Sequence, residues 1–183
     1  MSTRYHTVAW DQLHRDARTL AGLLLESEKF TGIIAITRGG LIPAAIIARE
    51  LDIRVVETVS IVTYQEERIG EPVVIKHPTV AGDGSGFLLI DDLVDTGTTA
   101  RVARALLPKA HFACIYAKPS GRPLVDTFVQ EVPQTTWILF PWDTEPQFTG
   151  CEPKLWDQAA AFDDASGWLR LAGADGLSAS AAQ

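Results

Sequence analysis

Residues 87–100 read FLLIDDLVDTGTTA, and this stretch decides the fold. Four large apolar residues are followed at once by two aspartates, Asp91 and Asp92, and then by an Asp-Thr-Gly-Thr-Thr run. The apolar segment 87–90 predicts a buried strand, and residues 98–110 predict a helix. A buried strand that feeds a helix through a glycine turn is typical of an α/β protein, in which ligands bind at the carboxyl ends of the strands.

The rest of the chain repeats this alternation of strands and helices. In the first predicted helix, Leu13, Ala17, Leu20 and Leu24 fall on one face, and we expect Asp11 to be its N-cap. Alternation of this kind predicts a mostly parallel, twisted sheet flanked by helices. The predicted strands are 32–36, 54–64, 72–76, 87–90, 111–117, 126–132 and 137–140, and the predicted helices are 11–25, 41–52 and 98–110.

Composition and charge exclude several classes of protein. The 183 residues are 46% hydrophobic and carry a net charge of −7, which argues against non-specific binding of nucleic acid. Two cysteines cannot form a disulfide framework; we expect Cys114 to be a buried thiol, and both cysteines fit a reducing cytosol. The start of the chain does not resemble a signal peptide, and no apolar run approaches the roughly 18 residues of a membrane span.

The two ends of the chain differ in character. Residues 1–150 have the pattern of one domain with its own core. Residues 151–183 form a C-terminal extension that we expect to be partly helical and then disordered. Nine of its last twelve residues are Ala, Ser or Gly, which cannot supply a core.

The DDLVDTGTT segment has two chemically distinct halves. The Asp-Thr-Gly-Thr-Thr run, Asp95 to Thr99, suits an anion because a helix start offers free N–H groups. Asp91 and Asp92 suit neutral hydroxyls or a divalent cation. A phosphate joined to a diol is a ribose 5-phosphate, and that is the predicted ligand. The competing interpretations are solvated acids beside an ordinary helix start, and an aspartic protease motif, which would need an all-β setting.

IDDLVDTGTTA is similar to the phosphoribosyl pyrophosphate (PRPP) motif of the type I phosphoribosyltransferases. TRGG at 37–40, AKPSGRPLVD at 117–126 and TWILFPWD at 136–143 resemble the purine branch of that family in bacteria, and the resemblance covers roughly residues 9–143. It implies a type I phosphoribosyltransferase-like fold with a small hood. It also implies transfer of the 5-phosphoribosyl group from PRPP to N9 of a 6-oxopurine, with release of pyrophosphate. Guanine and xanthine, and less directly hypoxanthine, would give GMP, XMP and IMP in purine salvage.

The same resemblance implies a set of residues that hold PRPP. Arg38 and Gly39 would bind pyrophosphate, in a loop where the family often has a non-proline cis peptide, and Arg68 would lie on a loop that closes over PRPP. Asp91 and Asp92 would hold the ribose hydroxyls, with Asp92 as the contact to Mg²⁺. The full PRPP-binding set is Arg38, Gly39, Arg68, Asp91, Asp92, Leu93, Val94, Asp95, Thr96, Gly97, Thr98 and Thr99.

A second set would bind the purine. Asp95 would face N7 and move a proton there, Lys118 would donate to the 6-oxo oxygen, Trp137 would stack on the ring, and the Ile138 backbone would meet the 2-position. The competing interpretations are a solvated Lys118 at a strand end and a buried, structural Trp137. Leu139 stands where well-known relatives have an acidic residue, so the preference among the three bases stays open.

The resemblance also implies partners and a location. Relatives form homo-oligomers, tetramers or dimers, and act in the cytoplasm, in some cases peripherally on the inner membrane face. The alternative function is a PRPP-sensing regulatory protein of the same fold. Such a protein would need a basic surface or a DNA-binding segment, and neither is evident in this acidic sequence.

Overall fold

The computed structural model describes residues 4–27, 29–63 and 72–143. All of them belong to one unit, residues 1–146. The predicted extension 151–183, Cys151 and Arg68 lie outside the described residues, so the expectations for them stay predictions. No helix among the described residues is long and apolar enough to cross a membrane.

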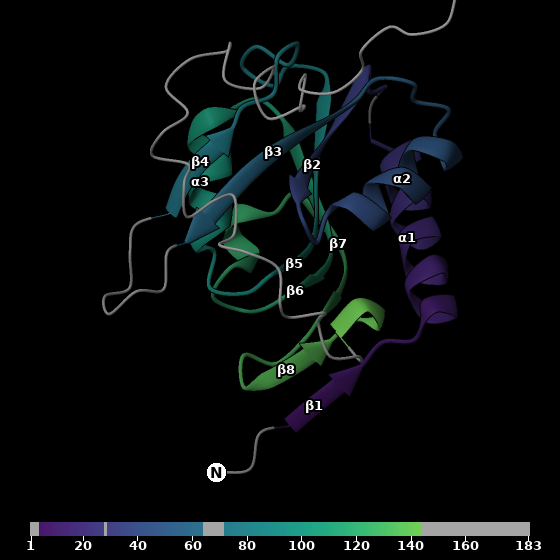
Figure 1. Cartoon of the computed structure of the whole chain (residues 1–183). Helices are drawn as coiled ribbons and strands as arrows, with labels where there is room; N and C mark the ends of the chain where they lie inside the picture. The colour runs from purple at the N-terminus through teal and green to yellow at the C-terminus, as the bar shows by residue number, and fades with distance from the viewer. Residues whose placement is uncertain (1–3, 28, 64–71, 144–183) are drawn as a thin grey trace, which may run out of the picture. The chain divides into compact units, whose positions relative to one another are not determined.

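A six-stranded sheet forms the centre of this unit (Figure 1). Its strand order is β4-β3-β2-β5-β6-β7, and every neighbouring pair is parallel except β3 and β4. The expected fold class, a mostly parallel sheet flanked by helices, is therefore confirmed. The strands are β2 (Gly32–Thr37), β3 (Val56–Thr63), β4 (Pro72–Lys76), β5 (Phe87–Val94), β6 (His111–Ala117) and β7 (Thr127–Glu131).

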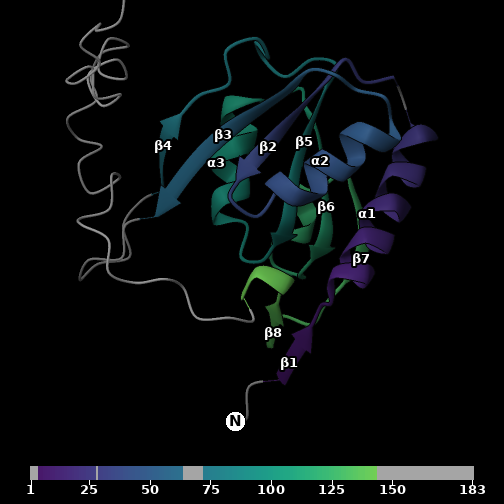
Figure 2. The same ribbon diagram turned by 45° about the vertical axis from the view of Figure 1, so that its right-hand side comes forward.

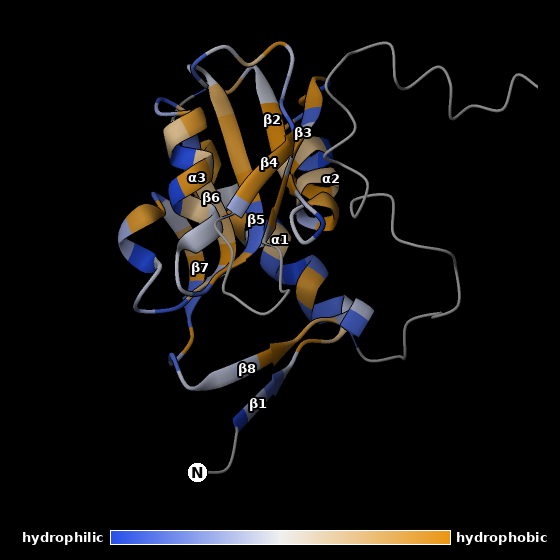
Figure 3. Cartoon of the chain, turned by 60° about the vertical axis from the view of Figure 1, so that its left-hand side comes forward, coloured by the Kyte–Doolittle hydropathy of each residue, from blue (hydrophilic) through white to orange (hydrophobic). Residues whose placement is uncertain are grey.

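Helices cover both faces of this sheet, because alternate residues of each central strand point to opposite sides. Ile33 of β2 packs in one cluster with α1 (Trp10–Leu25) and α2 (Leu41–Glu50). Ile34, the next residue, packs in a second cluster with α3 (Thr98–Leu106). Figure 2 shows α1 and α2 together on the side of the sheet opposite α3, and Figure 3 shows hydrophobic colour along the central strands.

The predicted face of the first helix is confirmed, since Leu13, Ala17, Leu20 and Leu24 are all fully buried. The predicted capping role of Asp11 is wrong. Ala9 is the N-cap and makes no side-chain cap bond, and the Asp11 carboxylate instead pairs with the Arg15 guanidinium at 2.7 Å. Cys114 is a buried, free thiol, as expected.

Arg104 on α3 holds the turn between β6 and β7 in place. Its guanidinium donates to the carbonyl oxygens of Leu124 and Ala110 at 3.0 and 2.8 Å. It also pairs with the Asp126 carboxylate at 2.5 Å. Only 23% of the Arg104 side chain is exposed, so these bonds satisfy a guanidinium that has little access to water, although the Asp126 side chain is 42% exposed.

The last predicted strand does not join the main sheet. β8 (Thr136–Leu139) pairs in parallel with β1 (Arg4–Thr7), a strand that the sequence did not predict. Tyr5 lies opposite Trp137 and His6 opposite Ile138. Figures 1 and 2 both show this pair of strands side by side, next to one end of the main sheet. The first residues of the domain and the TWIL segment therefore form one small sheet, followed by a short 3-10 helix, Pro141–Asp143.

Candidate active site

The aspartates of the opening motif lie within β5, not after it. The prediction that this strand ends at residue 90 is wrong by four residues, because β5 keeps pairing with β6 as far as Val94, opposite Ala117. Asp91 is buried, and its carboxylate accepts the Asp92 N–H at 3.0 Å. Asp92 is partly exposed, and its carboxylate accepts the Leu93 N–H at 2.7 Å. Two acids are thus held by the sheet at its carboxyl edge.

Burial dominates the electrostatics of these two acids. Burial raises the pKa of Asp91 well above its usual 3.8, and the charge of Asp92 raises it further. Burial also raises the pKa of Asp92, to about 6, with a smaller contribution from the charge of Asp143. Adjacent acids in a poorly hydrated place are stabilised by a proton, a hydroxyl donor or a cation.

The donor set at this edge fits a shared magnesium ion better than a resident one. No group of three or more His, Cys, Asp or Glu side chains among the described residues is arranged to hold a metal. Mg²⁺ is commonly held by one or two carboxylates, with phosphate oxygens and water completing its shell. Asp91 and Asp92 can supply the carboxylates, and a bound phosphoribosyl compound would supply the rest.

The loop after β2 lies directly against Asp92. The Thr37–Arg38 peptide is cis, and Gly40 is the N-cap of α2. A Cβ atom placed on Gly39 would lie 2.4 Å from the Asp92 carboxyl carbon and from both of its oxygens. Only glycine lets the backbone come this close. The structure therefore brings Gly39 and Asp92, 53 residues apart in sequence, into contact, and it leaves Arg38 exposed beside them.

The turn after β5 has the geometry of an anion cradle. Gly97 is the N-cap of α3 with φ of +81°, a left-handed conformation that favours glycine. A Cβ atom there would also lie 2.7 Å from the Leu124 side chain. Thr96 and Thr98 share a hydrogen bond between their hydroxyl oxygens at 3.0 Å. Free N–H groups of the first helical turn and hydroxyl donors thus surround the start of α3.

Asp95 lies at the centre of a hydrogen-bonded network. The Lys118 ammonium donates to its Oδ2 at 2.7 Å, and the Gln134 amide nitrogen donates to its Oδ1 at 2.6 Å. Lys118 is only 3% exposed, so the interpretation of a solvated strand-end lysine is wrong. Gln134 also accepts the Ser120 N–H at 3.0 Å. The sequence did not single out Gln134, because one glutamine in a polar loop carries no pattern.

The two purine-binding candidates of β8 have opposite exposures. Trp137 is 58% exposed and Ile138 is 5% exposed. The interpretation of Trp137 as a buried, structural tryptophan is therefore wrong, and its indole face is free for stacking among the described residues. Ile138 is fixed by the core and by pairing with β1, so its backbone position is well defined.

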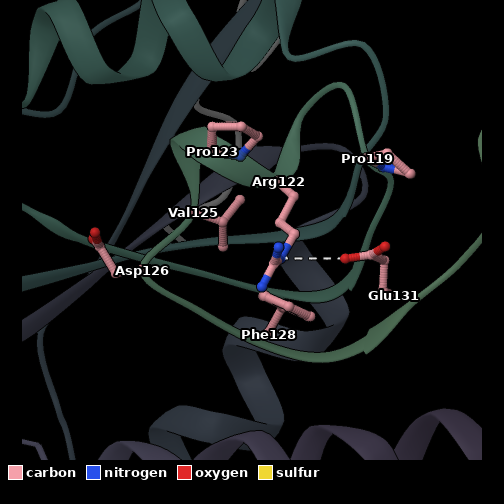
Figure 4. A pocket seen from close by; sticks show the side chains of 7 residues that line it. All are labelled: Pro119, Arg122, Pro123, Val125, Asp126, Phe128 and Glu131. Carbon is pink, nitrogen blue, oxygen red and sulfur yellow. Dashed lines mark ion pairs between the residues drawn. The ribbon is translucent and has the colours of Figure 1, made fainter.

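A pocket of about 470 Å³ lies beside the loop that follows Lys118 (Figure 4). Its charged groups pair with each other or with neighbours. Arg122 lies between Glu131, at 3.2 Å, and the Phe128 ring, at 5.5 Å, and Asp126 pairs with Arg104. None of the predicted site residues lines it. The pocket is lined by Pro119, Arg122, Pro123, Val125, Asp126, Phe128 and Glu131.

Comparison with known proteins agrees with this geometry. The model of the phosphoribosyl transferase domain matches residues 9–149. The chain is 64% identical over 146 residues to a xanthine-guanine phosphoribosyltransferase of Desulfotalea psychrophila, covering 79% of this chain and 90% of that one. It is 59% identical over 150 residues to the enzyme of the same name from Gluconobacter oxydans, covering 80% and 89%.

Solved structures show the same fold. The purine phosphoribosyltransferase of Pyrococcus horikoshii superposes with a TM-score of 0.65 at 29% identity, covering 82% of this chain and 99% of that one. The xanthine-guanine-hypoxanthine phosphoribosyltransferase of Helicobacter pylori gives 0.66 at 19% identity, covering 78% and 95%. The chain therefore belongs to the phosphoribosyltransferase family.

Proposed function

We propose that this protein is a purine-salvage phosphoribosyltransferase with the activity of a xanthine-guanine phosphoribosyltransferase. It joins N9 of a 6-oxopurine to C1′ of PRPP and releases pyrophosphate. The observation that carries the proposal is the meeting of three groups at one edge of the sheet: Gly39 against Asp92, the turn at Gly97, and the Lys118–Asp95 pair. Guanine would give GMP and xanthine XMP, and hypoxanthine, as a weaker substrate, IMP.

The sugar-phosphate half of the site would hold PRPP still. The N–H groups and hydroxyls of residues 95–99 bind the 5′-phosphate, and the backbone of Leu93 and Val94 shapes the entry to that turn. Asp91 and Asp92 accept hydrogen bonds from the ribose hydroxyls, which relieves the burial of their charges. Arg38 and the Gly39 backbone take the pyrophosphate, and Arg68 would add a further cation.

Mg²⁺ bound at Asp92 would neutralise the departing pyrophosphate. C1′ gains positive charge as that group leaves, so the reaction depends on fixed charges and on alignment of the purine nitrogen. Asp95 accepts a hydrogen bond from N7–H of the base and can take that proton as N9 attacks. The chain supplies position and charge, and no covalent intermediate with the protein is needed.

The base half of the site would select 6-oxopurines. Lys118 reaches Asp95 at 2.7 Å, which places its ammonium beside the atom that faces N7. The 6-oxo oxygen of guanine or xanthine accepts a hydrogen bond from such a group, and the 6-amino group of adenine does not. Trp137 stacks on the ring, and the Ile138 backbone lies at the 2-position.

The direct test is formation of GMP from guanine, PRPP and Mg²⁺ by the full chain. A comparison of kcat/KM for guanine, xanthine, hypoxanthine and adenine then measures base selection, with adenine expected to be inactive. Asp95→Asn is expected to keep PRPP affinity and to lose most turnover; unchanged turnover would remove Asp95 from the chemistry. A PRPP-sensing regulator would bind PRPP and form no nucleotide.

Assembly and location extend the proposal. We expect a homo-oligomer, a dimer or tetramer, acting on cytoplasmic substrates, with peripheral association at the inner membrane face as a further expectation from the family. Nucleic acid is not an expected partner, given the net charge of −7. Sedimentation of the full chain measures the oligomeric state directly.

A further inference from the structure

We propose that Gln134 is a positioning residue for this reaction, because it fixes the plane of the Asp95 carboxylate. The inference rests on the proposed function and deepens it. Asp95, Lys118 and Gln134 come from the segments that follow three neighbouring strands, β5, β6 and β7. The fold therefore brings them together at one edge of the sheet, although Asp95 and Gln134 are 39 residues apart.

One hydrogen bond cannot fix a carboxylate. Lys118 holds only Oδ2 of Asp95, at 2.7 Å, and the carboxylate could still turn about its last single bond. The Gln134 amide at 2.6 Å holds Oδ1 as well. With both oxygens held, the plane of the carboxylate and the direction of its free lone pairs are set.

Gln134 is itself oriented by its other end. Its Oε1 accepts the Ser120 N–H at 3.0 Å, so the amide nitrogen must face Asp95. This assignment of oxygen and nitrogen is the only one that satisfies both neighbours, since a backbone N–H cannot accept and a carboxylate cannot donate. Gln134 therefore links the loop after Lys118 to Asp95, so the position of that loop helps to fix the Asp95 carboxylate.

The contact matters most once a purine is bound. When Lys118 turns toward the 6-oxo oxygen, its bond to Asp95 is weakened or shared. Gln134 then becomes the contact that keeps Asp95 aligned with N7. A merely structural glutamine would affect folding or PRPP binding, whereas a positioning glutamine affects the turnover step.

Two substitutions separate these roles. Gln134→Met removes both hydrogen bonds. Gln134→Glu keeps an acceptor for the Ser120 N–H but places a carboxylate opposite Asp95, so it retains the Ser120 bond and replaces the positioning contact with a like-charge contact. Gln130→Glu is the matched control, because Gln130 is an exposed residue of β7. Each variant of the full chain is assayed with guanine, PRPP and Mg²⁺, and PRPP affinity and thermal unfolding are measured in parallel.

Both Gln134 variants are expected to lose about 10- to 100-fold in kcat, the range for a hydrogen bond to a charged group, with PRPP affinity within about twofold of wild type. The Gln134→Glu variant should regain activity relative to wild type as the pH falls. Two carboxyls in contact take up a shared proton at low pH, and the protonated Glu can again donate to Asp95. Gln130→Glu should show neither effect.

Three results would overturn the inference. The first is wild-type kcat in Gln134→Glu at neutral pH, which would assign the residue to the Ser120 bond alone. The second is a loss confined to PRPP affinity, and the third is a pH profile of Gln134→Glu that runs parallel to wild type. The pH profile decides even if Gln134→Met does not fold. If the wild type forms no nucleotide from any 6-oxopurine, the proposed function fails and this inference fails with it; if the wild type is active, only the inference is at stake.

Discussion

Gly39→Ala tests the contact between Gly39 and Asp92 on which the proposed binding of PRPP depends. The added methyl carbon would lie 2.4 Å from the carboxyl carbon and both oxygens of Asp92, whereas ordinary contacts begin at 3.4 Å. The carboxylate must therefore retreat by about 1 Å, a displacement that at a reacting centre lowers activity about 100-fold. That factor corresponds to a loss of about 2.7 kcal/mol of transition-state stabilisation.

The assay is kcat/KM for PRPP at saturating guanine and Mg²⁺, with thermal unfolding as a check on the fold. The expected fall is about 100-fold, with little change in the unfolding temperature, because the atoms that must move are the end of one side chain. Gly22→Ala is the matched control: Gly22 is exposed on α1, and a Cβ atom there meets nothing within 4 Å. Equal kcat/KM values for the two variants would refute the assignment of Gly39 and Asp92 to PRPP binding.

Three further predictions follow from other contacts. Lys118→Met should lower kcat/KM for guanine by about 10- to 100-fold, because the 6-oxo oxygen loses a charged donor; an unchanged value in steady-state assays would place base recognition elsewhere. Asp92→Asn should raise the free energy of unfolding by about 3 kcal/mol at pH 8 and by less than about 1 kcal/mol at pH 4. The reason is that the pKa of Asp92 is raised to about 6, so the stability given by its neutral form is lost as the pH rises through 6; a difference in urea unfolding that does not vary with pH would contradict this. Arg104→Met should lower the free energy of unfolding by about 2 kcal/mol, because a largely buried guanidinium loses three acceptors, one of which is the carbonyl of the buried Ala110. Arg15→Met, at an exposed pair, should change little; equal effects of the two substitutions in urea unfolding would show that the Arg104 contacts do not stabilise the fold.

The central sheet could be predicted from the sequence because its strands are continuous apolar runs. Residues such as 32–36 and 111–117 are short, mainly apolar runs bounded by polar or turn-forming residues, and they are buried almost throughout, as strands covered on both faces are. The end of β5 could not be predicted in this way. Its two aspartates look like the start of a loop, but pairing with β6 continues to Val94, although pairing with β2 stops at Ile90. The partner strand on this one side keeps the backbone extended and outweighs the local charge.

The candidate site was predicted only in part. Asp95 and Lys118 were named because of the family resemblance, and the structure brings their side chains to 2.7 Å from each other. Their roles in catalysis, and that of Arg68, stay predictions. Gln134 was missed because its partners are far away in sequence, and a single amide has no periodicity. The exposure of Trp137 was also beyond the sequence, since it depends on which strand pairs with β8.

That pairing connects the amino-terminal segment to the residues proposed to select the base. Tyr5 and His6 lie in register with Trp137 and Ile138, so the backbone of residues 4–7 supports one wall of the proposed purine pocket. Changes near the amino terminus, such as an affinity tag placed too close to Arg4, would first alter the relative kcat/KM values for the different bases. The affinity for PRPP would change less. For anyone preparing this enzyme for kinetics, a tag at the other end of the chain, or one that is removed, is the safer choice.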